Sequence, residues 1–155
     1  MLRRLAFGLL AAGLLLIAAP AFAQPPTNTT THTNGLVETF VDVIPMCEDG
    51  GPLYTITTTS NSVMHETVFD DGRVHATFTQ TGTFSAVPLS DPDLPSFTGT
   101  FTTWGGFNQN GTTVNGTSTF NLNGTGSDGS RLSIHQVEHF NVRPDGSANE
   151  FFHCH

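Results

Sequence analysis

The sequence predicts an all-β protein in which one domain forms an antiparallel β-barrel of about eight strands. Short runs rich in Thr, Val and Phe are separated by Gly, Asp, Asn and Pro. No segment after residue 36 shows the 3.6-residue repeat of an amphipathic helix. Within the runs, apolar and hydroxyl side chains alternate with a period of two, which indicates a sheet with one buried face and one wet face.

Inward-facing glycines favour a closed sheet over a flat sandwich. In residues 73–84 the alternation places Phe78 on one side and Thr79 on the other. Gly82, Gly99 and Gly116 then fall on the apolar side of three consecutive expected strands. Glycine weakens a strand unless the backbone must bend or approach a neighbour closely, so repeated inward glycines indicate a tightly coiled sheet.

The expected strands are bounded by turn residues, and the longest gap, 85–96, holds three prolines and is expected to be a surface loop. A three-residue reversal at 70–72 would pair Val68 with Val74 and Met64 with Phe78, which keeps the apolar face continuous. The Asp-Gly pattern recurs at Asp145-Gly146. The strands are expected at 36–44, 53–59, 62–69, 73–84, 97–105, 112–123, 130–142 and 148–154.

The first 23 residues have the pattern of a cleaved signal peptide. A basic start precedes an apolar run at 5–19, and Ala21-Phe22-Ala23 supplies a cleavage site. The run is shorter than the roughly 20 residues of a spanning helix. We therefore expect a secreted protein that is not embedded in a membrane. Residues 24–35 are expected to form a flexible tail, and 36–155 the barrel domain.

Charge restricts the partners that this protein can bind. The chain has 5 basic and 13 acidic residues, for a formal charge of −8. Loss of Arg3 and Arg4 with the leader takes it from −8 to −10. Removal of 23 residues from 155 leaves 132, enough for one hydrophobic core. So acidic a surface repels phosphate, which argues against nucleic acid and anionic lipid as partners.

Cys47 and Cys154 are the two cysteines, and export favours a disulfide between them. In a regular eight-strand meander, however, the two cysteines would lie at opposite rims. If 53–69 is instead one bent strand, both reach the same rim; a non-meander connection is the other solution. A rival hypothesis is a metal site at His153-Cys154-His155, which requires a free thiolate.

Histidines suggest a second chemistry. His65 and His75 would sit diagonally across one hairpin, and His135 and His139 lie on one face of a later strand. Four residues along a strand span about 13 Å, so His135 and His139 cannot share an ion unaided. These four are weak metal-ligand candidates, and exposed histidines without a role are the simpler interpretation. No bound cofactor is expected.

Two carboxylates and two aromatic residues complete the candidate set. Glu66 and Glu138 fall on the apolar side of their strands, where burial would raise a carboxyl pKa and suit general acid or base work. Tyr54 and Trp104 could line an opening. The sequence contains no serine elbow, phosphate loop or dinucleotide fingerprint. The ligand-binding candidates are His65, His75, Glu66, Glu138, Trp104 and Tyr54.

Turn and histidine motifs also carry a resemblance. His65-Glu66-Thr67 leading to Asp71-Gly72, the run Gly126 to Arg131, His139, and a cysteine near each end of the domain are present. On these residues, over most of 36–155, the chain resembles small secreted all-β proteins of unassigned function from high-GC Gram-positive bacteria. The resemblance implies the domain type and no mechanism.

The function expected from these observations is binding, either of a small apolar ligand inside the barrel or of a protein partner at its rim. The alternative is a barrel enzyme of the isomerase or cyclase type, with Glu66 or Glu138 acting beside a histidine. A third possibility is an interaction protein that uses its threonine face.

Overall fold

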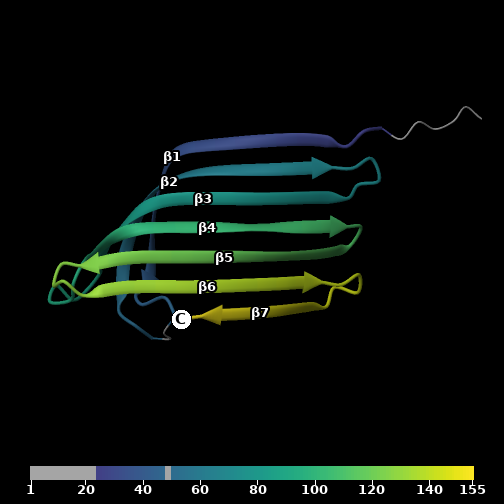
Figure 1. Cartoon of the computed structure of the whole chain (residues 1–155). Coiled ribbons are helices and arrows are strands. Elements are labelled where there is room, and N and C mark those ends of the chain that lie inside the picture. Colours follow the sequence, from purple (N-terminus) through teal and green to yellow (C-terminus); the bar gives the residue numbers. More distant parts are fainter. Residues whose placement is uncertain (1–23, 48–49) are drawn as a thin grey trace, which may run out of the picture.

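The computed structural model describes residues 24–47 and 50–155, and the predicted signal peptide lies outside them. Seven antiparallel strands form one sheet in the order of the chain (Figure 1). The all-β fold predicted from the sequence is confirmed. The strands are β1 (Thr27–Val43), β2 (Leu53–Val68), β3 (Val74–Pro88), β4 (Phe97–Asn110), β5 (Thr113–Gly126), β6 (Arg131–Val142) and β7 (Ala148–Cys154).

The sheet is open, and the predicted barrel is not formed. Every ladder joins strands that are consecutive in sequence, and β1 and β7 share no ladder among the described residues. At one end the strands bend strongly, so that β1 and β2 turn behind the rest of the sheet (Figure 1). The other end is nearly flat. The alternation in the sequence predicts which side of each strand faces inward, but it does not predict whether the two edge strands pair with each other.

The strand alternation sorts the side chains into two faces as expected. Phe101 is 8% exposed on the concave face, while Thr100 beside it is exposed on the opposite face. Thr79 is likewise exposed. We call the side that bears Phe84, Phe101 and Leu122 the concave face, and the side that bears threonine, asparagine and histidine the polar face.

Glycines allow the bend. A Cβ atom on Gly99 would lie 2.0 Å from the backbone oxygen of Asn123 and 2.6 Å from the Cα of Gly124, so β4 and β5 could not approach as they do. The ring of Phe101 lies where a Cβ on Gly82 would be. The inward glycines predicted from the sequence therefore shape the bend without closing a barrel.

The core lies inside the bend. Buried apolar side chains from β2 to β6 meet Ile44, which follows β1, and Met46 and Cys47 pack against this cluster. The Cys47–Cys154 disulfide links the chain after β1 to the end of β7, and the Cα atoms are 5.4 Å apart. The disulfide therefore joins the two edges of the sheet at one end, where no backbone ladder in the described part of the chain connects β1 and β7. The buried cluster consists of Ile44, Tyr54, Ile56, Phe84, Ala86, Phe97, Phe101, Leu122, Leu132 and Ile134.

One long strand explains how the cysteines meet. The structure has a single β2 from Leu53 to Val68 where two strands, 53–59 and 62–69, were expected. Seven strands instead of eight bring the end of β1 and the end of β7 to the same rim. Of the two solutions left open by the sequence, the bent single strand is the one found.

The N-terminal segment differs from the expected tail. β1 begins at Thr27, and Thr27 to Thr33 pair with β2, followed by a register shift before Leu36. These residues are mostly exposed on both sides. A strand that is wet on both faces needs no apolar alternation, which is why the sequence pattern misses it.

Three hairpin loops share one design. In each, an aspartate carboxylate accepts a hydrogen bond from the backbone N–H two residues later, and the intervening glycine has positive φ. The register predicted for the first, Val68 with Val74 and Met64 with Phe78, is confirmed. The loops contain Asp71-Gly72, Asp128-Gly129 and Asp145-Gly146, where glycine φ values are 81°, 84° and 81°.

Replacing Gly99 by alanine is expected to destabilise the fold by about 1–3 kcal/mol, because the added methyl group meets backbone atoms of β5 that cannot move independently. Urea denaturation measures the change. Gly51→Ala is the matched control, since a Cβ there meets nothing closer than 3.5 Å. Equal stabilities of the two variants would show that the bend does not need a bare backbone at Gly99.

Removing the disulfide by Cys47→Ala with Cys154→Ala is expected to lower the free energy of unfolding by up to about 4–5 kcal/mol. The bond closes a loop of sequence separation 107, and loops of that size carry the largest entropic gain. Urea denaturation of the double variant and of the oxidised parent provides the comparison. A loss below about 1 kcal/mol would mean that the ladders alone hold the bent end.

Candidate functional site

A groove of about 200 Å³ lies on the concave face, inside the bend. β1 and the chain after it contribute Phe40, Ile44 and Met46. Strands β2 to β4 contribute apolar side chains as well, and β5 and β6 supply the rest. The remaining apolar lining residues are Ile56, Phe84, Phe101, Phe120, Leu122, Leu132 and Ile134.

A few polar groups interrupt this apolar lining. Gln80 and Thr103 belong to the same cross-strand row, next to the row of Phe101. The side-chain amide of Gln80 donates to the hydroxyl oxygen of Ser60 at 2.9 Å, and Ser60 is buried. Glu38 is the carboxylate that lines the groove, and it is exposed. The groove can therefore take an apolar body and present hydrogen-bonding groups to one part of it.

The polar face is a regular array of short side chains. One row reads Asn28, Thr67, His75, Asn108 and Asn115 from β1 to β5. Its members bond along the row: His75 Nδ1 lies 2.6 Å from Asn108 Oδ1, and Asn108 donates to Asn115 at 3.3 Å. These bonds fix side-chain directions across strands and hold the face ordered.

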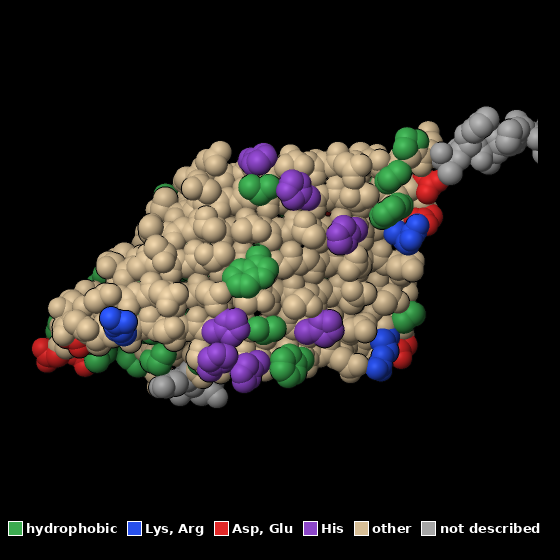
Figure 2. Space-filling model, viewed as in Figure 1, with side chains coloured by type: hydrophobic (Ala, Val, Ile, Leu, Met, Phe, Trp, Pro, Cys, Tyr) green, Lys and Arg blue, Asp and Glu red, His purple; other side chains and the backbone are tan. Residues whose placement is uncertain are grey.

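All seven histidines belong to this face or to its margin. They gather in two groups, one over β1 to β3 and one over β6 and β7 (Figure 2). His65 Nδ1 lies 2.9 Å from Thr30 Oγ1, and His139 Nδ1 lies 2.8 Å from Thr117 Oγ1. The predicted diagonal arrangement of His65 and His75 across their hairpin is confirmed by the register.

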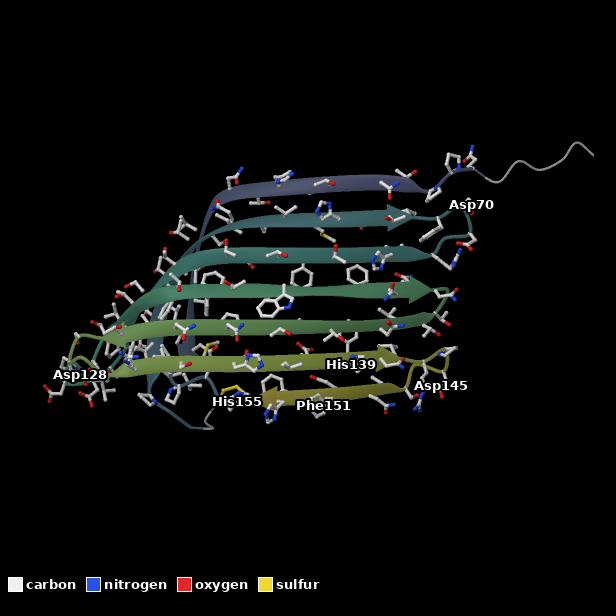
Figure 3. The ribbon with its side chains drawn as sticks, viewed as in Figure 1. Asp70, Asp128, His139, Asp145, Phe151 and His155 are labelled. Carbon is white, nitrogen blue, oxygen red and sulfur yellow. A yellow bond between two sulfur atoms is a disulfide. The ribbon has the colours of Figure 1, made fainter. Side chains whose placement is uncertain are left out.

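A third histidine pairing was not foreseen. His135 and His155 lie directly opposite each other and exchange backbone hydrogen bonds of 2.7 and 3.0 Å. Figure 3 places His155 beyond the end of β7, whereas His139 lies further along β6, opposite Phe151. Cys154 is in the expected disulfide, so the rival hypothesis of a metal site on a free thiolate at this ending is wrong, but the two flanking histidines remain.

The other ligand-binding candidates are spread over the molecule. Tyr54 is buried in the core at 2% exposure, and its hydroxyl donates to the backbone oxygen of Pro95 at 3.1 Å. Trp104 lies on the polar face and is 40% exposed. His65, His75, Trp104 and Tyr54 are therefore not among the groove residues.

The two predicted carboxylates lie on the concave face, as expected, but outside the groove. Glu66 and Glu138 are half-buried on the flatter part of β2 and β6. The hydroxyl of Ser118 lies 3.5 Å from Glu138 Oε2. Sequence reasoning missed Glu38; the alternation Leu36, Glu38, Phe40 within β1 is the signal that could have found it.

Comparisons with protein-family models, curated proteins and solved structures give no match. The resemblance to small secreted all-β proteins from high-GC Gram-positive bacteria therefore stays a prediction. No group of three or more His, Cys, Asp or Glu side chains within 24–47 and 50–155 is already arranged to hold a metal ion. The same part of the chain contains no helix long and apolar enough to cross a membrane.

Alkaline unfolding should report on Tyr54. Burial raises the pKa of its phenol above the ordinary value, and the carboxylates of Asp128 and Asp91 add to the shift. A raised folded-state pKa means that stability is full below about pH 10 and is lost as pH rises further. The chain has one tyrosine and no lysine, and both cysteines are oxidised. A loss of stability near pH 10 can therefore be assigned to the Tyr54 phenol without interference from lysine or cysteine side chains.

Tyr54→Phe is expected to cost about 1 kcal/mol at neutral pH, through loss of the bond to Pro95, and to remove this alkaline decline. Urea denaturation between pH 8 and pH 11 measures both effects. A parent and a variant that lose stability in parallel above pH 10 would contradict the assignment to Tyr54.

Proposed function

We propose that this protein is a secreted binding protein that holds a small apolar molecule in the groove of its concave face. The observation that supports this most directly is that the phenylalanines of the bend leave space between them. Phe84, Phe101 and Phe120 line the groove, and about 200 Å³ remains among them and their neighbours. A fully packed interior would have filled that volume with side chains.

The chemistry of the lining suits such a ligand. Ligand sites are concave and mostly apolar, with a small number of polar groups that fix orientation. Here Thr58, Gln80, Thr103 and Glu38 are those polar groups. Gln80 is held by Ser60, so its amide is positioned before any ligand enters.

The volume limits the size of the ligand. An engineered apolar cavity of about 150 Å³ takes up benzene. The groove is somewhat larger, so a one- or two-ring aromatic compound or a short branched hydrocarbon chain fits its dimensions.

Secretion is the setting proposed for this activity. The Cys47–Cys154 disulfide agrees with an oxidising compartment, and the N-terminal sequence pattern agrees with export. A protein partner at the rim remains the second form of the binding hypothesis. The isomerase or cyclase alternative gains no support from the geometry, because neither Glu66 nor Glu138 lines the groove.

Filling the groove should abolish ligand uptake. Thr103→Phe places a ring into the groove and is expected to weaken binding of the uncharged two-ring naphthalene dye Prodan at least about tenfold, or about 1.4 kcal/mol. Dye fluorescence during titration gives the dissociation constant. Native mass spectrometry of protein from its own secretion medium would identify a ligand retained from the host.

Thr100→Phe is the matched control, because it makes the same substitution on the same strand but on the polar face. It should leave dye affinity within about twofold of the parent, a difference below 0.5 kcal/mol. Circular dichroism checks that both variants fold. Equal losses of affinity in the two variants, or dye binding that survives in Thr103→Phe, would refute the groove as the binding site.

A further inference from the structure

Three histidines gather at one corner of the polar face, at the edge of the sheet. His135 comes from β6, and His153 and His155 come from β7 and the residue after it. The ring centres of His135 and His155 are 5.0 Å apart, as are those of His153 and His155. His155 therefore stands within reach of both other rings, away from the apolar groove.

The spacing matches the needs of a transition-metal ion. An ion that binds two imidazole nitrogens at about 2.0–2.1 Å in tetrahedral geometry holds the ring centres roughly 5 Å apart. As placed, no three His, Cys, Asp or Glu side chains of the described residues could hold an ion, so a site here requires the rings to turn. Because His153 and His155 are exposed, rotation about their side-chain bonds can supply that turn without moving the strands.

The backbone fixes the positions from which these rings turn. His135 and His155 bond to each other through both backbone groups, at 2.7 and 3.0 Å. Cys154, between His153 and His155, packs against the core and is held by the disulfide. The disulfide therefore anchors the end of the edge strand covalently. Because the backbone is already held in place, binding an ion costs little further backbone entropy.

A neighbouring side chain also prepares His135. Its Nδ1 bonds to Asn121 Oδ1 on β5, directly across the ladder. An amide oxygen accepts a hydrogen bond, so Nδ1 of His135 carries the ring proton and Nε2 carries the lone pair that a metal needs. Metal-bound histidines commonly donate their second ring nitrogen to such an acceptor.

From these contacts we propose that His135, His153 and His155 form a binding site for a divalent transition-metal ion of the kind that prefers imidazole, Zn²⁺ or Cu²⁺. Three nitrogen ligands leave a fourth position open to water or to a small ligand. The acidic chain, with a formal charge of −8, favours the approach of cations. The intact disulfide distinguishes this site from one built on a cysteine thiolate.

Calorimetric titration of Zn²⁺ and of Cu²⁺ into the oxidised, tag-free protein tests the site. We expect one ion per chain for the parent. His135→Ala and His155→Ala should each weaken binding at least about tenfold. His139→Ala is the matched control, because His139 lies on the same strand and face as His135 but four residues away, and it should bind as the parent does.

Unfolding midpoints in chelator separate a loss of ligand from a loss of fold, because metal-free variants that fold normally keep the parent's midpoint. The absence of one-to-one binding by the parent would overturn the proposal. So would equal weakening by His139→Ala and His135→Ala, which would indicate diffuse association with surface histidines. Dye binding in the groove is independent of both results.

Discussion

A sheet without a second layer can shield its apolar side chains from water only by bending over them. Here the strands bend at one end, so the chain after β1 is brought against Leu132 and Ile134 of β6. Burial of the core side chains in that bend, among them Phe84 and Phe101, supplies the hydrophobic stabilisation of the fold. The bend in turn requires backbone contact between β4 and β5 at Gly99, and it is secured by the Cys47–Cys154 bond. The core and the groove both depend on this bend.

The two ends of the sheet differ because only one of them bends. At the bent end, buried residues such as Ile56, Phe84 and Ile134 pack together. At the flatter end, Phe152 on the same face is 57% exposed. The groove lies where the buried cluster gives way to polar side chains such as Gln80 and Thr103. A site in this position is reached from the concave side and is bounded by rigid strands, which agrees with a preformed binding surface.

Much of the fold could be predicted from the chain because period-two alternation is a local property. It correctly assigned Phe101 inward and Thr100 outward, and the Asp71-Gly72 turn fixed the first hairpin register. Closure into a barrel could not be predicted, because it depends on whether β1 and β7 pair. The residue pattern of one strand contains no information about its pairing with the other. The strand character of 27–35 was missed because both of its faces are wet.

The site was harder to predict than the fold. Glu66 and Glu138 were assigned to the correct face, yet where the bend begins along each strand decides which residues of that face enclose a volume. Sequence pattern gives the side of the sheet and not the position along it. The pairing of His135 with His155 follows from the β6–β7 register, which rests on a turn at Asp145-Gly146 of the same design as the first.

The order of the strands has a consequence for how this chain assembles. Because each strand pairs with its neighbours in sequence, every hairpin can form without waiting for a distant segment, and the sheet can grow stepwise by addition at an edge. The two sulfur atoms, by contrast, are separated by 107 positions and meet only when the intervening strands are in place. The disulfide is thus expected to form late, after the strands between the two cysteines have paired in the correct register.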